Sequence, residues 1–309
     1  MLPIGPVAAI DCGTNSTRLL VADSSGKPLE RLMRITRLGE GVDATGTLAT
    51  EAMDRCTAVL RDFRSVMDRR GVVRGRLVAT SAVRDASNGA DFLAAAGEAS
   101  GFEAELLAGT EEGRLSLAGA VADLDPAYGP FLVLDIGGGS TELVTGASPD
   151  DPDLASVSLQ VGCVRITERI LRSDPPTPDE RARAEAMVGE LLETALADHP
   201  AFLGPHTLVG LAGTVSTLSS LNLGLDEYDR DLIHHSVLTA EEVGAWYATL
   251  AGEVRAARLD RAGMVPGRED VIAGGALILA VVMTRLGLER CLVSESDILD
   301  GLVAGLVAG

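Results

Sequence analysis

One motif occurs twice in the chain, and this internal repeat constrains the fold more than any other feature of the sequence. Segments 10–21 and 134–144 match when Asp11 is placed on Asp135, with an Asp, a Gly, a Ser, a Thr and a Leu in register. Each segment follows a short apolar run and continues into apolar or alternating residues. The pattern is typical of a strand, a tight glycine turn and a second strand. The sequence therefore predicts one β-hairpin with a glycine-rich tip in each half.

The two tips have the chemistry of a phosphate site. Glycine lets backbone N–H groups approach a phosphate closely, and consecutive N–H groups form an anion-binding nest. Asp11 and Asp135 end the strands that lead into the tips. A carboxylate beside a phosphate requires a hard cation such as Mg²⁺ between them. Two tips that face each other across a cleft could hold a phosphate chain from both sides.

The remaining hydrophobic patterns predict two α/β halves without a low-complexity linker. The prolines between residues 123 and 130 mark a hinge, so we expect domains at 1–125 and 126–309, with the last helix able to pack back on the first. Thr110 is a predicted N-cap, and Thr177 with Glu180 forms a predicted capping box. The expected helices are 50–70, 90–100, 109–123, 178–196, 241–252, 270–286 and 297–307. The expected strands outside the hairpins are 29–35, 77–79, 103–107, 154–160, 208–211 and 292–293, with a turn over 87–89.

The charge balance limits the partners of the chain. The formal net charge is −19, so the protein should repel nucleic acid and anionic membranes on average. Aromatic residues make up only 3%, which leaves few side chains for base stacking. A polyanionic substrate must then bind at a local positive site on this negatively charged protein, made from backbone N–H groups, a metal ion and a few arginines. Lys27 is the only lysine, and the arginine bias suits bidentate phosphate contacts but follows equally from genomic base composition.

The cysteines and the start of the chain add further exclusions. Cys12, Cys56, Cys163 and Cys291 are scattered without a Cys-x-x-Cys pair, so neither a zinc site nor a disulfide framework is indicated. The first residues lack a basic region followed by a long apolar stretch, and no apolar run reaches transmembrane length. We therefore expect a cytoplasmic protein without a nucleic-acid or membrane partner, and a homodimer is compatible with the sequence.

Four motifs along the chain point to one family. They read ATSAVRDASN at 79–88, GTEEGR at 109–114, DIGGGSTE at 135–142 and LAGT at 211–214. Together with the paired tips they resemble the exopolyphosphatase/guanosine pentaphosphate phosphohydrolase family of the acetate kinase/hexokinase/actin superfamily, over essentially the whole chain. The resemblance implies two actin-like (ribonuclease H-like) domains, each a mixed sheet flanked by helices, with a cleft between them. Long members carry an extra C-terminal helical region after this core, and its absence here implies a preference for short polyphosphate chains.

The resemblance also implies roles for individual residues. Glu112 matches the general base that activates water, and Glu142 matches a second essential carboxylate near the metal. Asp11 and Asp135 match metal-facing aspartates, and Arg84 matches an arginine that contacts phosphate. Gly213 and Thr214 match a segment that contacts a nucleotide in ATP-using relatives, and whether it binds anything here stays open. The residues that match the phosphate tips are Asn15, Ser16, Gly137, Gly138, Gly139, Ser140 and Thr141.

The implied reaction is metal-dependent hydrolysis that releases terminal orthophosphate from inorganic polyphosphate, with Mg²⁺ or Mn²⁺ as cofactor. The residue chemistry agrees, because phosphoryl transfer depends on positioning and charge neutralisation, and a carboxylate can accept the proton of an in-line water. Hydrolysis of guanosine pentaphosphate at its 5′ end would use the same residues, and the sequence does not separate the two. A sugar or acetate kinase would usually place an Asp where Glu112 stands. A non-catalytic polyphosphate or nucleotide sensor would not need to keep all four carboxylates.

Two pairs of adjacent residues, one of glutamates and one of histidines, are candidates for the site. Adjacent helical residues point about 100° apart, so only one of Glu111 and Glu112 should face the cleft. His234 and His235 could ligate a metal or catalyse. They have no partner His or Cys at ligand spacing, which favours a role in a loop or in packing.

Two residues near the first tip have competing interpretations. Cys12 follows Asp11, whose charge would raise the pKa of the thiol, and this favours packing over nucleophilic catalysis. Arg18 occupies the position in the repeat that Glu142 occupies in the second half. It could reach the substrate or pair with an acid, and the sequence leaves both open.

Overall fold

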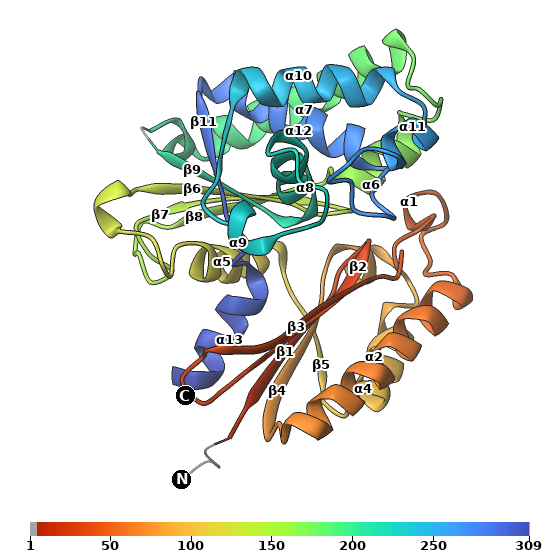
Figure 1. Ribbon diagram of the computed structural model, residues 1–309, viewed down its shortest axis with the longest axis vertical. Helices are drawn as coiled ribbons and strands as arrows, with labels where there is room; N and C mark the ends of the chain where they lie inside the picture. Colours follow the sequence, from red (N-terminus) through yellow and green to blue (C-terminus); the bar gives the residue numbers. More distant parts are fainter. Residues whose placement is uncertain (1–4, 205, 309) are drawn as a thin grey trace. The chain divides into compact units, whose positions relative to one another are not determined.

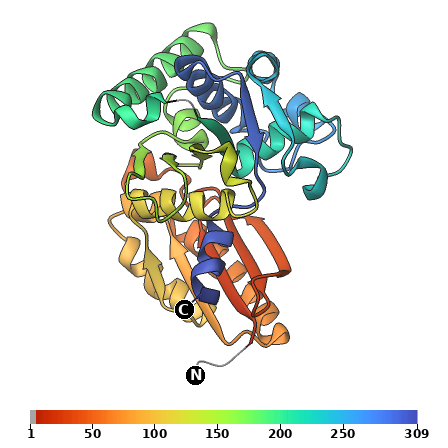
Figure 2. The same cartoon turned by 90° about the vertical axis from the view of Figure 1, so that its left-hand side faces the viewer.

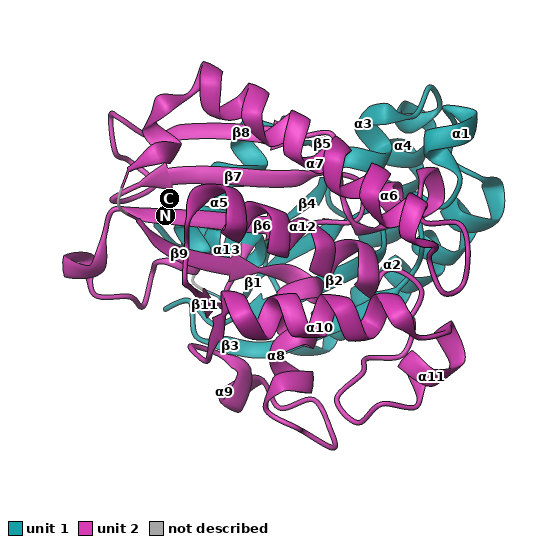
Figure 3. Cartoon of the chain, turned by 90° about the horizontal axis from the view of Figure 1, so that it is seen from above, with its two compact units in different colours: residues 1–119, 298–309 teal, residues 120–297 magenta. Residues whose placement is uncertain are grey.

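The computed structural model describes residues 5–204 and 206–308, which form two compact units (Figure 3). Unit 1 contains residues 1–119 and 298–309, and unit 2 contains residues 120–297. The chain thus leaves unit 1 after Gly119, earlier than the expected boundary after residue 125, and its last helix belongs to unit 1. The expectation that the chain has no leader rests partly on residues 1–4, which lie outside the described residues.

Unit 1 is built on a mixed sheet in the order β3-β2-β1-β4-β5. β1 pairs antiparallel with β2 and parallel with β4, so the hairpin lies beside two parallel strands. All six residues of β1 are buried, as expected for a central strand covered on both faces. The strands are β1 (Val7–Cys12), β2 (Ser16–Ala22), β3 (Pro28–Ile35), β4 (Arg74–Ala79) and β5 (Ala104–Leu106).

Helices cover both faces of this sheet (Figures 1 and 2). Successive residues of a strand point to opposite faces: Ala8 and Ile10 pack in the cluster under α2 and α4, whereas Val7 and Ala9 pack with α5 and α13. Gly71 ends α2 with a φ of 66°, a conformation that glycine adopts without steric cost. The helices are α1 (Val42–Thr45), α2 (Thr50–Arg70), α3 (Ser81–Asp85), α4 (Gly89–Ser100), α5 (Gly109–Ala120) and α13 (Ile298–Ala308).

Unit 2 repeats the strand order of unit 1. Its sheet runs β10-β11-β9-β6-β7-β8. Taken from the opposite edge, the strands β8-β7-β6-β9-β11 correspond in order to β3-β2-β1-β4-β5 of unit 1, so that β6 corresponds to β1. The hairpin β6–β7 and the parallel neighbour β9 correspond to β1–β2 and β4. The strands are β6 (Phe131–Ile136), β7 (Thr141–Gly146), β8 (Ala155–Leu159), β9 (Thr207–Leu211), β10 (Val237–Thr239) and β11 (Arg290–Val293). The repeat in the sequence is therefore a repeat of topology.

Helices α7, α10 and α12 lie over one face of the second sheet (Figure 1), where they share its largest apolar cluster. The predicted capping box is present, because Thr177 Oγ1 accepts a hydrogen bond from the N–H of Glu180 while the Glu180 carboxylate accepts from the N–H of Thr177. The helices of unit 2 are α6 (Cys163–Arg169), α7 (Pro178–Asp198), α8 (Ala212–Asn222), α9 (Arg230–Ile233), α10 (Ala240–Gly252), α11 (Arg255–Leu259) and α12 (Ile272–Leu286), with 3₁₀ turns at Pro126–Tyr128 and Pro200–Leu203.

The predicted two-part α/β architecture is confirmed, but one local prediction is wrong. Thr110 is not an N-cap: α5 already begins at Gly109, because the N–H of Glu112 donates to the carbonyl of Ala108 one turn earlier. The expected turn after β4 is present at residues 87–88, and the segment before it forms the short helix α3, which the sequence did not indicate. Among the described residues, no helix combines the length and apolarity that crossing a bilayer would require.

Candidate active site

The predicted site residues of unit 1 follow the carboxyl ends of three neighbouring strands. Asp11 lies near the end of β1, Arg84 lies in α3 after β4, and Glu112 lies in the first turn of α5 after β5. Because β1, β4 and β5 are parallel, their carboxyl ends meet at one edge of the sheet. Arg84 Nη1 lies 3.4 Å from Glu112 Oε2 and donates to the carbonyl of Leu107 at 2.8 Å. The fold thus brings the predicted base and the predicted phosphate arginine into contact.

The two adjacent glutamates of α5 have different surroundings. Glu111 accepts two hydrogen bonds of 2.9 Å from the guanidinium of Arg114, one turn along the helix. These bonds from Arg114 lower the pKa of Glu111. The Glu112 side chain is 12% exposed, whereas that of Glu111 is 40% exposed. Only Glu112 therefore points toward Arg84, which agrees with the angular separation expected of neighbours on a helix.

The first glycine tip is held by its backbone. The N–H of Gly13 donates to the carbonyl of Ser16 at 3.0 Å, which closes the turn. The carbonyl of Asn15 accepts from the N–H groups of Thr36 and Arg37, at 3.1 and 2.9 Å. A trans peptide points its N–H away from its C=O, so the N–H of Ser16 is directed away from Thr36 and Arg37. Asn15 and Ser16 are half-buried and thus lie at a turn whose backbone is held by these hydrogen bonds.

The second tip uses the same closing bond, from the N–H of Gly137 to the carbonyl of Ser140 at 3.0 Å. The carbonyls of Gly137 and Gly138 accept from the N–H groups of residues 163–165, at distances of 2.9 to 3.0 Å, in the first turn of α6. By the same peptide geometry, the N–H groups of Gly138 and Gly139 point away from α6. Two consecutive N–H groups aimed in this way form an anion-binding nest.

Gly162 is a residue of this site that the sequence did not reveal. A Cβ at Gly162 would lie 2.5 Å from both the carbon and the oxygen of the Gly138 carbonyl, so only glycine lets α6 approach the tip. The other two predicted tip residues are buried: Ser140 is 2% exposed, and the Thr141 hydroxyl donates to the carbonyl of Val161 at 2.6 Å. Thr141 therefore uses its hydroxyl to fix the segment before Gly162.

The acids that precede the tips have different cross-strand partners. Asp11 is in register with Arg18, and Arg18 Nη2 and Nε both donate to Asp11 Oδ2, at 2.6 and 3.0 Å. Asp135 is in register with Glu142, so two carboxylates occupy facing positions. Glu142 is 1% exposed, and its Oε1 accepts from the Ser158 hydroxyl at 2.7 Å. At the first tip the aspartate thus faces a guanidinium, and at the second it faces another carboxylate.

Comparison with known proteins identifies the family of the chain. The model of the Ppx/GppA phosphatase family matches residues 20–308. The chain belongs to this family. The resemblance found in the sequence motifs is thereby confirmed.

Individual relatives match the chain along nearly its whole length. Exopolyphosphatase 2 of Mycobacterium tuberculosis (strain CDC 1551 / Oshkosh) is 44% identical, with 97% of this chain and 98% of that protein covered. A crystal structure of an exopolyphosphatase-like protein is similar with a TM-score of 0.92 and 35% identity, covering 98% of this chain and 99% of that chain. A crystal structure of the Aquifex aeolicus Ppx/GppA family member has a TM-score of 0.81 and 31% identity, with 99% of each chain covered.

The two residues predicted to contact a nucleotide lie at the start of α8 and have protein neighbours. Arg268 Nη1 donates to the carbonyl of Gly213 at 2.8 Å and to Thr217 Oγ1 at 2.9 Å. Thr214 is buried against Gly275, where a Cβ would come within 2.2 Å of its hydroxyl. Gly213 and Thr214 therefore have packing roles inside unit 2 of this Ppx/GppA chain. Nucleotide contact by these residues stays a prediction.

The cysteines of this Ppx/GppA chain are packing residues. All four are free and buried. The thiols of Cys12 and Cys56 lie 3.9 Å apart and share a hydrogen bond, which, with burial and the charge of Asp11, raises the pKa of Cys12. Burial raises the pKa of Cys163 to about 11. Thiols in such surroundings are poor nucleophiles, so the packing interpretation of Cys12 is supported.

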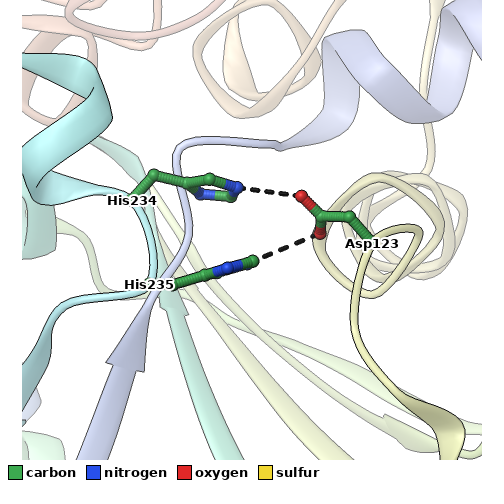
Figure 4. Close-up of side chains that lie close together, drawn as sticks. All are labelled: Asp123, His234 and His235. Carbon is green, nitrogen blue, oxygen red and sulfur yellow. Dashed lines mark hydrogen bonds and ion pairs between the residues drawn. The ribbon is translucent and has the colours of Figure 1, made fainter.

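The histidine pair has a partner that sequence spacing did not reveal (Figure 4). His234 Nε2 lies 2.9 Å from one Asp123 oxygen, and His235 Nε2 lies 3.5 Å from the other. The N–H of Glu295 donates to His234 Nδ1 at 3.0 Å. Nδ1 must therefore carry the lone pair, and neutral His234 carries its proton on Nε2 and donates to Asp123.

This tautomer bears on metal binding at the pair. A metal-bound imidazole usually donates a hydrogen bond from its second nitrogen, whereas the second nitrogen of His234 accepts one. The donor set of Asp123, His234 and His235 therefore suits a hydrogen-bonded link better than a metal centre. Burial of His234 also lowers its pKa, which favours the neutral form that this link requires.

Proposed function

We propose that this Ppx/GppA phosphatase is an exopolyphosphatase that releases terminal orthophosphate from inorganic polyphosphate with the help of a divalent cation. The observation that carries the proposal is the second tip, where the N–H groups of Gly138 and Gly139 point away from α6 beside the facing carboxylates of Asp135 and Glu142. A nest of N–H groups binds phosphate oxygens, and facing carboxylates bind a hard cation. The 44% identity to a protein named exopolyphosphatase 2 supports the same activity.

The residues of the second tip fit a magnesium or manganese ion. Asp135 is 8% exposed and Glu142 is 1% exposed, and like charges placed opposite each other on neighbouring strands disfavour the sheet unless a cation lies near them. Both ions prefer carboxylate oxygens and water. Asp135 and Glu142 would hold the ion, which would neutralise charge on the reacting phosphate. Ser158 would keep Glu142 oriented through its 2.7 Å hydrogen bond.

The acid–base step is assigned to Glu112. Its side chain is largely buried and contacts Arg84, and a carboxylate within reach of the attacking water can accept its proton. Glu112 would take the proton of the attacking water, and Arg84 would contact a phosphate oxygen of the substrate. Glu111 cannot share this role, because both of its oxygens accept hydrogen bonds from Arg114.

Parallel assays of phosphate release from polyphosphate, guanosine pentaphosphate and ATP test the proposal. We expect the highest kcat/KM with polyphosphate. Faster turnover of guanosine pentaphosphate would assign guanosine pentaphosphate hydrolysis to the same residues. Absence of phosphate release from all three substrates would refute the assignment as a phosphoanhydride hydrolase. Glu112→Gln should lower kcat by roughly 10²–10⁴ while folding is retained. The matched control, Glu111→Gln on the same turn, should leave kcat within about twofold, because it removes only an exposed ion pair.

Metal removal tests the role of the second tip. Activity should be lost in excess chelator and restored by Mg²⁺ or Mn²⁺, since two facing carboxylates beside a phosphate need a cation. Asp135→Asn should weaken the metal dependence and the turnover together. Full activity in excess chelator would contradict the assignment of Asp135 and Glu142 as ligands.

A further inference from the structure

The two tips share one pattern, and their charged residues differ at a single position. Each begins with an aspartate at the end of a strand, and each closes with an N–H to carbonyl bond of 3.0 Å between equivalent residues. The residue in register with the aspartate is Arg18 in the first tip and Glu142 in the second. Residues in register on neighbouring antiparallel strands place their side chains on the same face, within contact distance. The repeat therefore offers an internal comparison of one acid with two different partners.

We propose that Arg18 is the fixed cation of the first tip, so that Asp11 is not a metal ligand and the chain binds a single divalent ion, at Asp135 and Glu142. This inference rests on the metal dependence proposed above. It differs from the sequence-based expectation, which made Asp11 and Asp135 equivalent metal-facing residues.

The geometry of the first pair supports the proposal. Two nitrogens of Arg18 donate to the same oxygen of Asp11, at 2.6 and 3.0 Å, so that oxygen has two charge-assisted partners. Asp11 is 3% exposed and the Arg18 side chain is 19% exposed. A charge-assisted pair at this depth is poorly screened by solvent. A divalent ion at Asp11 would have to lie beside the guanidinium, whose like charge opposes its binding.

The role of Arg18 is then positioning. Its guanidinium neutralises Asp11 permanently, whereas the ion at the second tip can bind and leave. A fixed positive charge at the base of the first tip also favours a nearby phosphate without consuming a metal ligand. The two tips would thus supply one permanent and one exchangeable cation.

Direct counting of bound Mn²⁺ by equilibrium dialysis, without substrate, tests the proposal. The wild-type chain should bind one ion. Asp135→Asn should weaken binding at least tenfold, and Asp11→Asn should leave the affinity within about twofold, because a residue that is not a ligand does not change it. A tenfold loss of affinity in Asp11→Asn, or two ions on the wild-type chain, would overturn the inference. Absence of any bound ion on the wild-type chain would instead remove the proposed metal dependence itself.

Replacing Arg18 by the residue that stands at the equivalent position of the second tip should create a new metal site. Arg18→Glu recreates at the first tip the acid pair of the second, and the variant should bind a second ion. Its thermal midpoint should rise with added Mn²⁺ by more than that of the wild type. Arg18→Gln, which adds no carboxylate, is the control and should still bind one ion.

The reverse exchange keeps the test decisive if Arg18→Glu does not fold. Glu142→Arg should place a guanidinium opposite Asp135, retain the fold and bind no ion. The proposal states that the residue in register with each aspartate decides whether that tip binds a metal ion. It would be contradicted by a folded Arg18→Glu chain that binds only one ion. It would also be contradicted by a Glu142→Arg chain that still binds one ion with unchanged affinity.

Discussion

Replacement of Gly162 by alanine should damage catalysis through a single methyl group placed against the backbone of the second tip. The new Cβ would lie 2.5 Å from the carbon and oxygen of the Gly138 carbonyl and 2.6 Å from the Gly137 carbonyl oxygen. Backbone atoms cannot swing aside as a flexible side chain can. The backbone of Gly162 has φ −141° and ψ 172°, which alanine adopts without strain, so the expected effect is purely one of contact.

The magnitude follows from the distances. Restoring an ordinary contact of about 3.4 Å requires the tip and the start of α6 to separate by about 1 Å. A misplacement of about 1 Å in a reacting group can reduce turnover by about 10², which corresponds to about 2.7 kcal/mol of transition-state stabilisation. We therefore expect kcat/KM for polyphosphate to fall by about 10² in Gly162→Ala. Overpacking should also lower the free energy of unfolding by about 1–3 kcal/mol.

The assay compares kcat/KM and the urea midpoint of Gly162→Ala with those of Gly244→Ala. Gly244 lies inside α10 of the same unit, and a Cβ there meets no atom within 4 Å. The control should keep its activity and gain about 0.5–1 kcal/mol of stability, because alanine is the better helix former. A Gly162→Ala chain with wild-type kcat/KM would refute the argument that the position of the tip backbone sets the rate.

Three further changes test other contacts. Ser158→Ala removes the hydroxyl that donates to Glu142 and should lower kcat about tenfold, since a hydrogen bond to a charged group contributes about 1.5–3 kcal/mol; unchanged kcat at saturating metal would show that Ser158 does not position the acid. Thr177→Ala breaks the capping box of α7 and should lower the free energy of unfolding by about 0.5–2 kcal/mol, and an unchanged urea midpoint would contradict this. Burial lowers the pKa of His234, so its contribution to stability is present above the ordinary pKa of about 6.5 and is lost as pH falls through the lowered value. Urea titrations between about pH 7 and about pH 5 should therefore show a loss in the free energy of unfolding of the wild type that His234→Gln lacks. If the free energy of unfolding changed equally with pH in the wild type and the variant, the proposed link between His234 and Asp123 would be contradicted.

Some sequence-based expectations stay predictions. These are the preference for short polyphosphate chains, the identity of the metal and the contact of Gly213 and Thr214 with a nucleotide. The acidic net charge of −19 adds one more expectation, that moderate salt speeds encounter with a polyanion by screening repulsion beyond about 10 Å. Steady inhibition from the lowest salt upward would point to a basic entry patch instead.

The sequence by itself determined the features that depend on local patterns. Apolar runs ending in Asp, followed by Gly, located both hairpin tips, and the repeat between them predicted one such hairpin in each half. The helix predicted at 50–70 is α2, Thr50–Arg70, because its apolar period and its glycine end are both encoded within one stretch of chain. Thr177 and Glu180 were identifiable as a capping box for the same reason. Thr110 was misjudged because the helix start depends on a backbone bond to Ala108 that residue preference does not encode.

Only the tertiary structure decided which side chains meet. The sequence left Arg18 with two interpretations, because a pattern predicts a hairpin without fixing its register, and the register places Arg18 opposite Asp11. Ser158 reaches Glu142 only because β8 pairs with β7 in one alignment. Asp123 lies beside His234 although 111 residues separate them in the chain. Such pairs are set by how strands and loops from distant segments are packed, and the periodicities that reveal individual elements carry no information about that choice.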